Sequence, residues 1–141
     1  MSYSISVTSD HGACFALRHQ VFVVEQDVSI DEEIDDLDKL ATHLLATDNG
    51  VPTGTARVVY QGDTAKIGRV CVLKSARGTG LGADLIKAAV QQSKDQPGVT
   101  KAKLGAQLHA LGFYERLGFS VYGAVYLDAG IEHRDMVLDL R

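Results

Sequence analysis

Residues 77–83, Arg-Gly-Thr-Gly-Leu-Gly-Ala, combine one arginine with three alternating glycines just before an apolar segment with helical spacing. Glycine tolerates positive φ and lets a ligand approach the backbone closely. A helix start offers unpaired N–H groups and a partial positive charge, so an anion such as a phosphate is the favoured ligand. Arg77 could add its own charge. The segment therefore predicts an anion site, although alone it is also compatible with a turn that only packs tightly.

Three phosphate-binding patterns can be compared with this turn. A P-loop requires Lys-Ser/Thr after the glycines, and the sequence has none. A dinucleotide fingerprint fits Gly78, Gly80 and Ala83 formally, but the next expected strand ends in Gly105-Ala106-Gln107 without the required carboxylate. The pattern [QR]-x-x-G-x-[GA] is matched by Arg77, Gly80 and Gly82 and is the best of the three.

A second segment with chemical potential is residues 104–119, LGAQLHALGFYERLGF. It places an amide, Gln107, seven residues before the phenol of Tyr114. A phenol has a pKa of about 10, so at neutral pH it holds a proton that it can donate. The alternative is an aromatic side chain packed in the core beside Phe113.

Together these segments resemble the two signatures of the GNAT superfamily of N-acetyltransferases, with Gln107 where that family usually has Asn. The resemblance implies acetyl transfer from acetyl-CoA to a primary amine, by direct attack in a ternary complex. It implies that Tyr114 is a general acid, that the Val72 N–H polarises the thioester, and that the strand before the turn splays from the next. The implied acetyl-CoA contacts come from Val70, Cys71, Val72, Arg77, Gly78, Thr79, Gly80, Leu81, Gly82, Ala83, Gln107 and Tyr114.

The acceptor side is less defined. Six of the 18 acidic residues lie in residues 31–38, DEEIDDLD, which favours a cationic acceptor, small molecule or protein. The candidates are Glu25, Glu33, Asp35 and His133. A solvated helix face is the alternative for the acidic run, and a structural role is the alternative for the histidine.

Two longer segments, residues 17–38 and 126–136, resemble the ElaA-like branch of the GNAT family. Arg18, Phe22, Glu33, Asp35 and Asp38 also resemble the signature of acyl-homoserine lactone synthases. That likeness suggests a structural or substrate-side network among these residues. Two alternative functions therefore stay open: an acyltransferase like the lactone synthases, and an acetyl-CoA-binding sensor without turnover.

The composition limits the class of protein. The net charge of −4 argues against nucleic acid as a partner, and no apolar run is long enough to span a membrane. The N-terminus lacks the pattern of a signal peptide. Cys14 and Cys71 are far apart, which favours reduced core residues, no metal site and a cytoplasmic location. A homodimer through the C-terminal strands is compatible with the sequence.

The hydrophobic pattern predicts a single α/β (α+β) domain over residues 1–141, with helices flanking a mixed, mostly antiparallel sheet. The resemblance described above implies that this domain has the acyl-CoA N-acyltransferase (GNAT) fold. Asp10 should cap a helix to about Gln26, with Cys14, Leu17, Val21 and Val24 on one face. The acidic run should form a short helix with Ile34, Leu37 and Leu40 inward. The expected strands are 4–8, 42–47, 55–60, 66–73, 101–107, 119–127 and 133–140, and further helices follow the glycines and cover 108–118.

Overall fold

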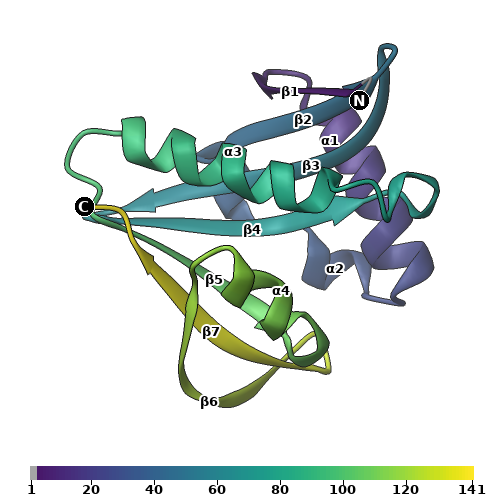
Figure 1. The fold of residues 1–141 in the computed structure, drawn as a ribbon. Coiled ribbons are helices and arrows are strands. Elements are labelled where there is room, and N and C mark those ends of the chain that lie inside the picture. The colour runs from purple at the N-terminus through teal and green to yellow at the C-terminus, as the bar shows by residue number, and fades with distance from the viewer. Residues whose placement is uncertain (1–2) are drawn as a thin grey trace.

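The computed structural model describes residues 3–141, and its strands form one seven-stranded sheet in the order β1-β2-β3-β4-β5-β7-β6 (Figure 1). Every neighbouring pair is antiparallel except β4–β5. The predicted GNAT fold is confirmed. The strands are β1 Tyr3–Thr8, β2 Thr42–Asp48, β3 Val51–Gln61, β4 Thr64–Val72, β5 Lys101–Gln107, β6 Ser120–Asp128 and β7 Ile131–Asp139.

Helices lie on both faces of the sheet (Figure 1). The long helix α3 covers one apolar cluster and α1 covers another, which contains Cys14, Leu17, Val21, Leu45 and Cys71. The helical segments are α1 His11–Arg18, η1 His19–Glu25, α2 Ile30–Glu33, η2 Asp36–Lys39, η3 Lys74–Ala76, α3 Leu81–Asp95, η4 Leu108–Ala110 and α4 Leu111–Arg116.

The first helix differs from its predicted form. Asp10 caps it as expected, accepting a hydrogen bond from the Ala13 N–H at 3.1 Å. The α-helix ends at Arg18, however, and η1 continues as a π-helix, in which the Gln26 N–H donates to the Val21 carbonyl five residues earlier. This wider turn rotates the apolar face. Val24, predicted to be inward, is therefore 59% exposed.

The acidic run is also turned the other way from its predicted orientation. Ile34 and Leu40 are 61% and 76% exposed, whereas Glu33 and Asp38 are buried. The cause is the arginine beneath them: the fully buried Arg18 of α1 bonds both carboxylates. The charge-assisted hydrogen bonds from Arg18 hold both carboxylates inward, and Ile34 and Leu40 are left at the surface.

Candidate active site

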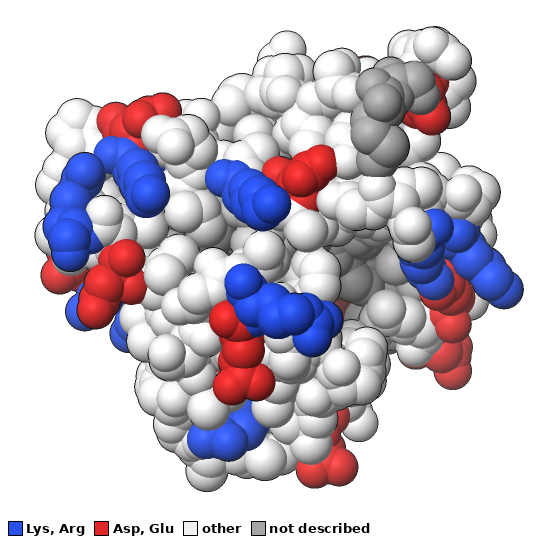
Figure 2. Space-filling model, in the orientation of Figure 1, with Lys and Arg blue, Asp and Glu red and all other residues white. Residues whose placement is uncertain are grey.

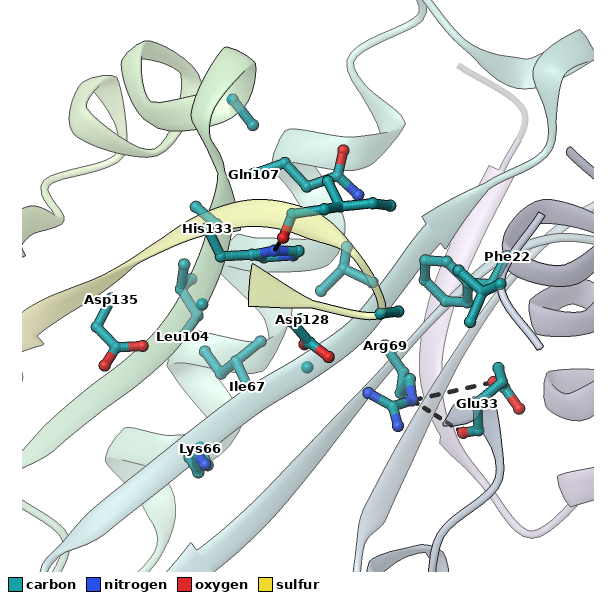
Figure 3. A pocket seen from close by; sticks show the side chains of 18 of the residues that line it. Phe22, Glu33, Lys66, Ile67, Arg69, Leu104, Gln107, Asp128, His133 and Asp135 are labelled. Carbon is teal, nitrogen blue, oxygen red and sulfur yellow. Dashed lines mark hydrogen bonds and ion pairs between the residues drawn. The ribbon is translucent and has the colours of Figure 1, made fainter. Parts of the chain in front are cut away.

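A cleft of about 390 Å³ opens where β4 and β5 separate. The two strands pair only from Thr64–Lys101 to Lys66–Lys103, and beyond this point the structure describes no pairing between them. The predicted splay is therefore present. Helical segments and strands from both halves of the chain line the cleft, with Val70 and Tyr114 among the lining residues. Figure 3 shows Phe22, Arg69, Gln107 and His133 around it.

From Ile67 onward, the edge of β4 that faces the cleft has no neighbouring strand within the described residues 3–141. Such an edge can bond an extended amide chain as a strand would. Val70 lines the cleft, whereas the Cys71 side chain points into the buried cluster under α1. Burial raises the pKa of the Cys71 thiol to about 12. A thiol that stays protonated is a poor nucleophile, so the Cys71 side chain is unsuited to attack a thioester.

The glycine turn lies at the end of β4 and leads into α3. Gly78 and Gly80 have φ of 79° and 86°, and an added Cβ at either position would meet no atom within 4 Å. These glycines are thus required by conformation, while the space above them is open. The Asp84 N–H donates to the Gly80 carbonyl at 3.1 Å, which makes it the first bonded amide of α3. The amides of residues 81–83 precede it, as at any helix start.

The same turn borders a second cavity of about 260 Å³. The Thr79 hydroxyl donates to the Ala76 carbonyl at 2.7 Å, which holds the turn closed on itself. On the face of the molecule that carries α3, basic and acidic side chains are interspersed (Figure 2). A positive field at the turn would therefore have to come from the backbone dipoles at the start of α3 and from Arg77. The cavity is lined by Tyr3, Asp48, Thr53, Ser75, Ala76, Thr79 and Leu81.

Arg77 forms a bidentate ion pair with Glu25, at 2.6 and 2.7 Å, and its Nε donates to the Val72 carbonyl at 3.1 Å. The hydrogen bond from Arg77 lowers the pKa of Glu25. The structure thus places Glu25, expected on the acceptor side, at the guanidinium expected at the phosphates. Both side chains are partly exposed, so the pair can open.

Tyr114 lies on α4 and lines the cleft. Its ring makes edge-to-face contacts with Phe113 and Phe119, with centroids 5.0 and 6.1 Å apart. Burial raises the pKa of the phenol, which keeps it protonated at neutral pH. Among residues 3–141 its hydroxyl makes no hydrogen bond, so the proton is free for another acceptor.

Gln107 ends β5 with its side-chain amide held at both ends. Its NH₂ donates to the Gln26 side chain at 3.3 Å, and its oxygen accepts from His109 at 2.7 Å. Gln26 follows η1, so this contact bridges the two sides of the cleft. Gln107 stands where the GNAT signature usually has Asn. Its side chain is longer than that of Asn, and its amide already has two hydrogen-bond partners in the protein.

The acidic candidates belong to a network of three arginines and three carboxylates. Arg57 bonds Asp35 through both terminal nitrogens, at 2.7 and 2.8 Å. Arg69 reaches Asp35 at 3.2 Å and the Glu33 carbonyl at 3.2 Å. Arg57 and Arg69 thus occupy the Asp35 carboxylate, and Arg18 occupies that of Glu33. Figure 3 shows Arg69 beside Glu33 at the wall of the cleft. Sequence reasoning missed Arg57 and Arg69, since their partners lie 22 and 34 residues away.

Arg69 has one further unusual feature, a φ of 49° within β4. The register between β3 and β4 shifts here, between Thr55 and Arg57. A non-glycine residue in this conformation is uncommon and marks a bulge. The bulge re-aims the Arg69 side chain toward the cleft wall, where it meets Glu33 and Asp35.

Comparison with known proteins agrees with this geometry. Residues 7–140 match the family model described as acetyltransferase (GNAT) domain. A Bacillus subtilis protein named as an acetyltransferase is 40% identical over 132 residues, covering 92% of this chain and 89% of its own. ElaA of Escherichia coli is 33% identical over 132 residues, covering 91% of this chain and 86% of its own.

A solved structure from Lactobacillus plantarum, named as an N-acetyltransferase, superposes with a TM-score of 0.90 at 31% identity and covers all of both chains. The fold, the splayed strands and these relatives agree. The chain belongs to the GNAT acetyltransferase family and is an acyltransferase, with ElaA among its homologues.

Proposed function

We propose that this enzyme transfers acetyl from acetyl-CoA to a primary amine by direct attack in a ternary complex. The observation that carries the proposal is the free edge of β4, which runs from the splay at Lys66 to the glycine turn and faces Tyr114 across one cleft. A pantetheine arm is an extended chain of amides that can bond such an edge. The pyrophosphate would then meet the start of α3.

Each predicted cofactor residue has a place in this proposal. Gly78, Thr79, Gly80, Leu81, Gly82 and Ala83 would present backbone amides to the phosphates, with charge from Arg77. Val70, Cys71 and Val72 would offer main-chain groups to the arm, and the Val72 N–H would polarise the carbonyl. Gln107 would bond the arm from β5.

When bound, acetyl-CoA supplies an activated acetyl thioester. The neutral acceptor amine forms the new C–N bond, and the C–S bond breaks with its electron pair on sulfur. Tyr114 is placed to give its proton to that sulfur, because its hydroxyl has no protein acceptor. This role stays a prediction, as do the homodimer, the single domain, the cytoplasmic location, and the absence of nucleic acid and membrane partners. Among residues 3–141, every helix is too short or too polar to cross a membrane.

The acceptor is an amine of a small molecule or of a protein. The ion pairs of Glu33 and Asp35 favour a structural role for both residues. The carboxylates that line the cleft without an arginine partner are Glu32, Asp128 and Asp135, and they favour an acceptor with a positive charge.

The experiment is a screen of acetyl-CoA against polyamines, amino sugars, aminoglycosides and lysine peptides, read by release of free thiol and by product mass. Acetylated product from at least one amine class is expected. Binding of acetyl-CoA without transfer to any amine would favour the sensor. Product only with an acyl-carrier-protein donor and S-adenosylmethionine would favour the lactone synthase, although the acetyltransferase relatives speak against it.

A further inference from the structure

His133 lies on β7 in the wall of the cleft, opposite Gln107 in the register with β5 (Figure 3). Its side chain is only 9% exposed. The ring therefore faces the cleft, where a ligand can contact it, and the rest of the ring is shielded from water.

The hydrogen bonds of the ring define its tautomer. Nδ1 lies 2.7 Å from the Ile131 carbonyl oxygen. A carbonyl oxygen only accepts, so Nδ1 carries the proton and donates it. In the neutral ring Nε2 then holds a lone pair. Among residues 3–141, Nε2 makes no hydrogen bond, and no buried side-chain nitrogen or oxygen lacks a partner. Nε2 is therefore not sealed in the protein, and its lone pair opens to the cleft.

The neighbours hold the ring in this orientation. Tyr126 of β6 stacks on it, with centroids 5.9 Å apart and planes at 24°. The Tyr126 hydroxyl donates to Asp135 at 2.8 Å and lies directly over Gly105 of β5. A Cβ at Gly105 would come within 2.3 Å of that hydroxyl. The glycine thus makes room for the tyrosine that supports the histidine.

The other titratable groups of the cleft are less suited to accept a proton. Glu33 is paired with arginine, and Asp135 accepts from Tyr126. Burial raises the pKa values of Tyr114 and Tyr126, so both phenols hold their protons.

The cleft also has three cationic side chains, Lys66, Arg57 and Arg69. His109 donates its ring proton to Gln107. Glu32 and Asp128 are exposed carboxylates, which suit them to attracting a cationic acceptor.

We propose that His133 is the general base of the reaction, an assignment that rests on the proposed function. An amine acceptor arrives as an ammonium ion and must lose a proton before its lone pair can attack. Nε2 takes that proton, and the neutral amine forms the C–N bond. As the C–S bond breaks, nitrogen loses its second proton and sulfur gains one through Tyr114. One proton is released overall, from the imidazolium to solvent.

The decisive variant is His133→Asn. Its amide can still donate to the Ile131 carbonyl from the position of Nδ1, while Nε2 is deleted. We expect kcat/KM at neutral pH to fall by about 10²-fold or more. The acidic limb of the pH profile should change, and the deficit should shrink as pH rises and solvent deprotonates the amine. His19→Gln, an exposed histidine on η1, is the matched control and should behave as wild type.

The dependence on the acceptor distinguishes a base from a structural residue. An aryl amine is already neutral at pH 7, so the deficit of His133→Asn should largely disappear with it. The assignment of His133 would be wrong if the deficit were equal for alkyl and aryl amines, or if the variant were as active as wild type with the same pH profile. Either result would leave the proposed function standing. Absence of transfer by the wild type to every amine would overturn the proposed function and this assignment with it. If His133→Asn fails to bind acetyl-CoA, His133→Gln takes its place in the same comparison.

Discussion

At the scale of single residues, the proposed general acid Tyr114 can be tested by one substitution. Its ring is fixed by two aromatic contacts, and its hydroxyl has no acceptor in the described chain. Tyr114→Phe keeps those contacts and deletes the proton. We expect unchanged folding and acetyl-CoA binding, with kcat lowered by about 10²-fold and little change in KM.

The test of this prediction uses the leaving group. A thioester of a more acidic thiol needs less protonation as it departs, so the deficit of Tyr114→Phe should shrink with such a donor. Steady-state kinetics with both donors measure this. If Tyr114→Phe is as fast as wild type with acetyl-CoA, Tyr114 serves only the packing of Phe113 and Phe119.

Gly80 allows the phosphate site to be tested by a matched pair. Asn and Asp both tolerate positive φ better than other residues do, so Gly80→Asn and Gly80→Asp carry a similar conformational cost. Only Asp adds a negative charge. We expect acetyl-CoA to raise the melting temperature of wild type and, less strongly, of Gly80→Asn, with the shift lost in Gly80→Asp. Equal shifts in both variants would place the pyrophosphate elsewhere.

Residue types and spacing were enough to single out the turn, Gln107 and Tyr114, because those motifs are local. The structure places Gln107 and Tyr114 in the wall of the cleft, and their roles stay predictions. They were not enough for the partners of the acidic run. Arg57 and Arg69 lie on strands, and their partner Asp35 lies 22 and 34 residues away. The pattern of a strand does not predict an ion pair with so distant a residue. The tautomer of His133 likewise depends on one backbone carbonyl and could not be read from the sequence.

At the scale of elements, the ionic network joins α1, α2, η2, β3 and β4. The hydrogen bond from Arg57 lowers the pKa of Asp35. Burial raises the pKa of Asp38, but hydrogen bonds from Arg18 and Arg57 outweigh it and keep it below its usual value. A depressed carboxylate pKa stabilises the native state above the unfolded pKa of about 3.9, and that contribution is lost as pH falls through the lower native pKa.

We therefore expect the free energy of unfolding to be steady above about pH 5 and to fall below about pH 4. Asp38→Asn should lower it at neutral pH by up to about 3 kcal/mol, since Arg18 and Arg57 each lose one of two carboxylate partners in a buried network. Its further loss at low pH should be smaller than that of wild type. Asp36→Asn, exposed on the same segment, is the control and should follow wild type. Denaturant unfolding from pH 3 to pH 7 measures both, and parallel curves for Asp38→Asn and wild type would contradict the expectation.

The main elements of the fold were predictable, because periodicity identifies strands and helices and the sheet follows from their order. The π-helix was not, since an i→i+5 turn has no pattern distinct from an α-helix until the apolar face drifts at Val24. The acidic run was misoriented for a related reason. Its aliphatic residues have the right spacing for an inward face, and only the buried arginine decides otherwise.

At the scale of the whole molecule, the pair Glu25–Arg77 joins the end of η1 to the residue before the glycine turn. Glu25 ends η1, and Phe22 and Gln26 of the same stretch line the cleft. Arg77 stands before the glycine turn. A phosphate that binds Arg77 must displace Glu25 or share the guanidinium with it. Binding at the turn should therefore change the contacts at the end of η1.

Glu25→Gln removes this competition without shortening the side chain. We expect it to tighten acetyl-CoA binding only modestly, by about threefold, because an exposed ion pair is weak. Arg77→Ala should weaken binding by about tenfold or more, through the loss of a charge-assisted hydrogen bond. In the double variant Glu25→Gln should have no further effect, because its whole influence acts through Arg77. Titration of the dissociation constant for the four proteins measures the coupling. Weaker binding in Glu25→Gln than in wild type would mean that the carboxylate holds Arg77 in place for the phosphate.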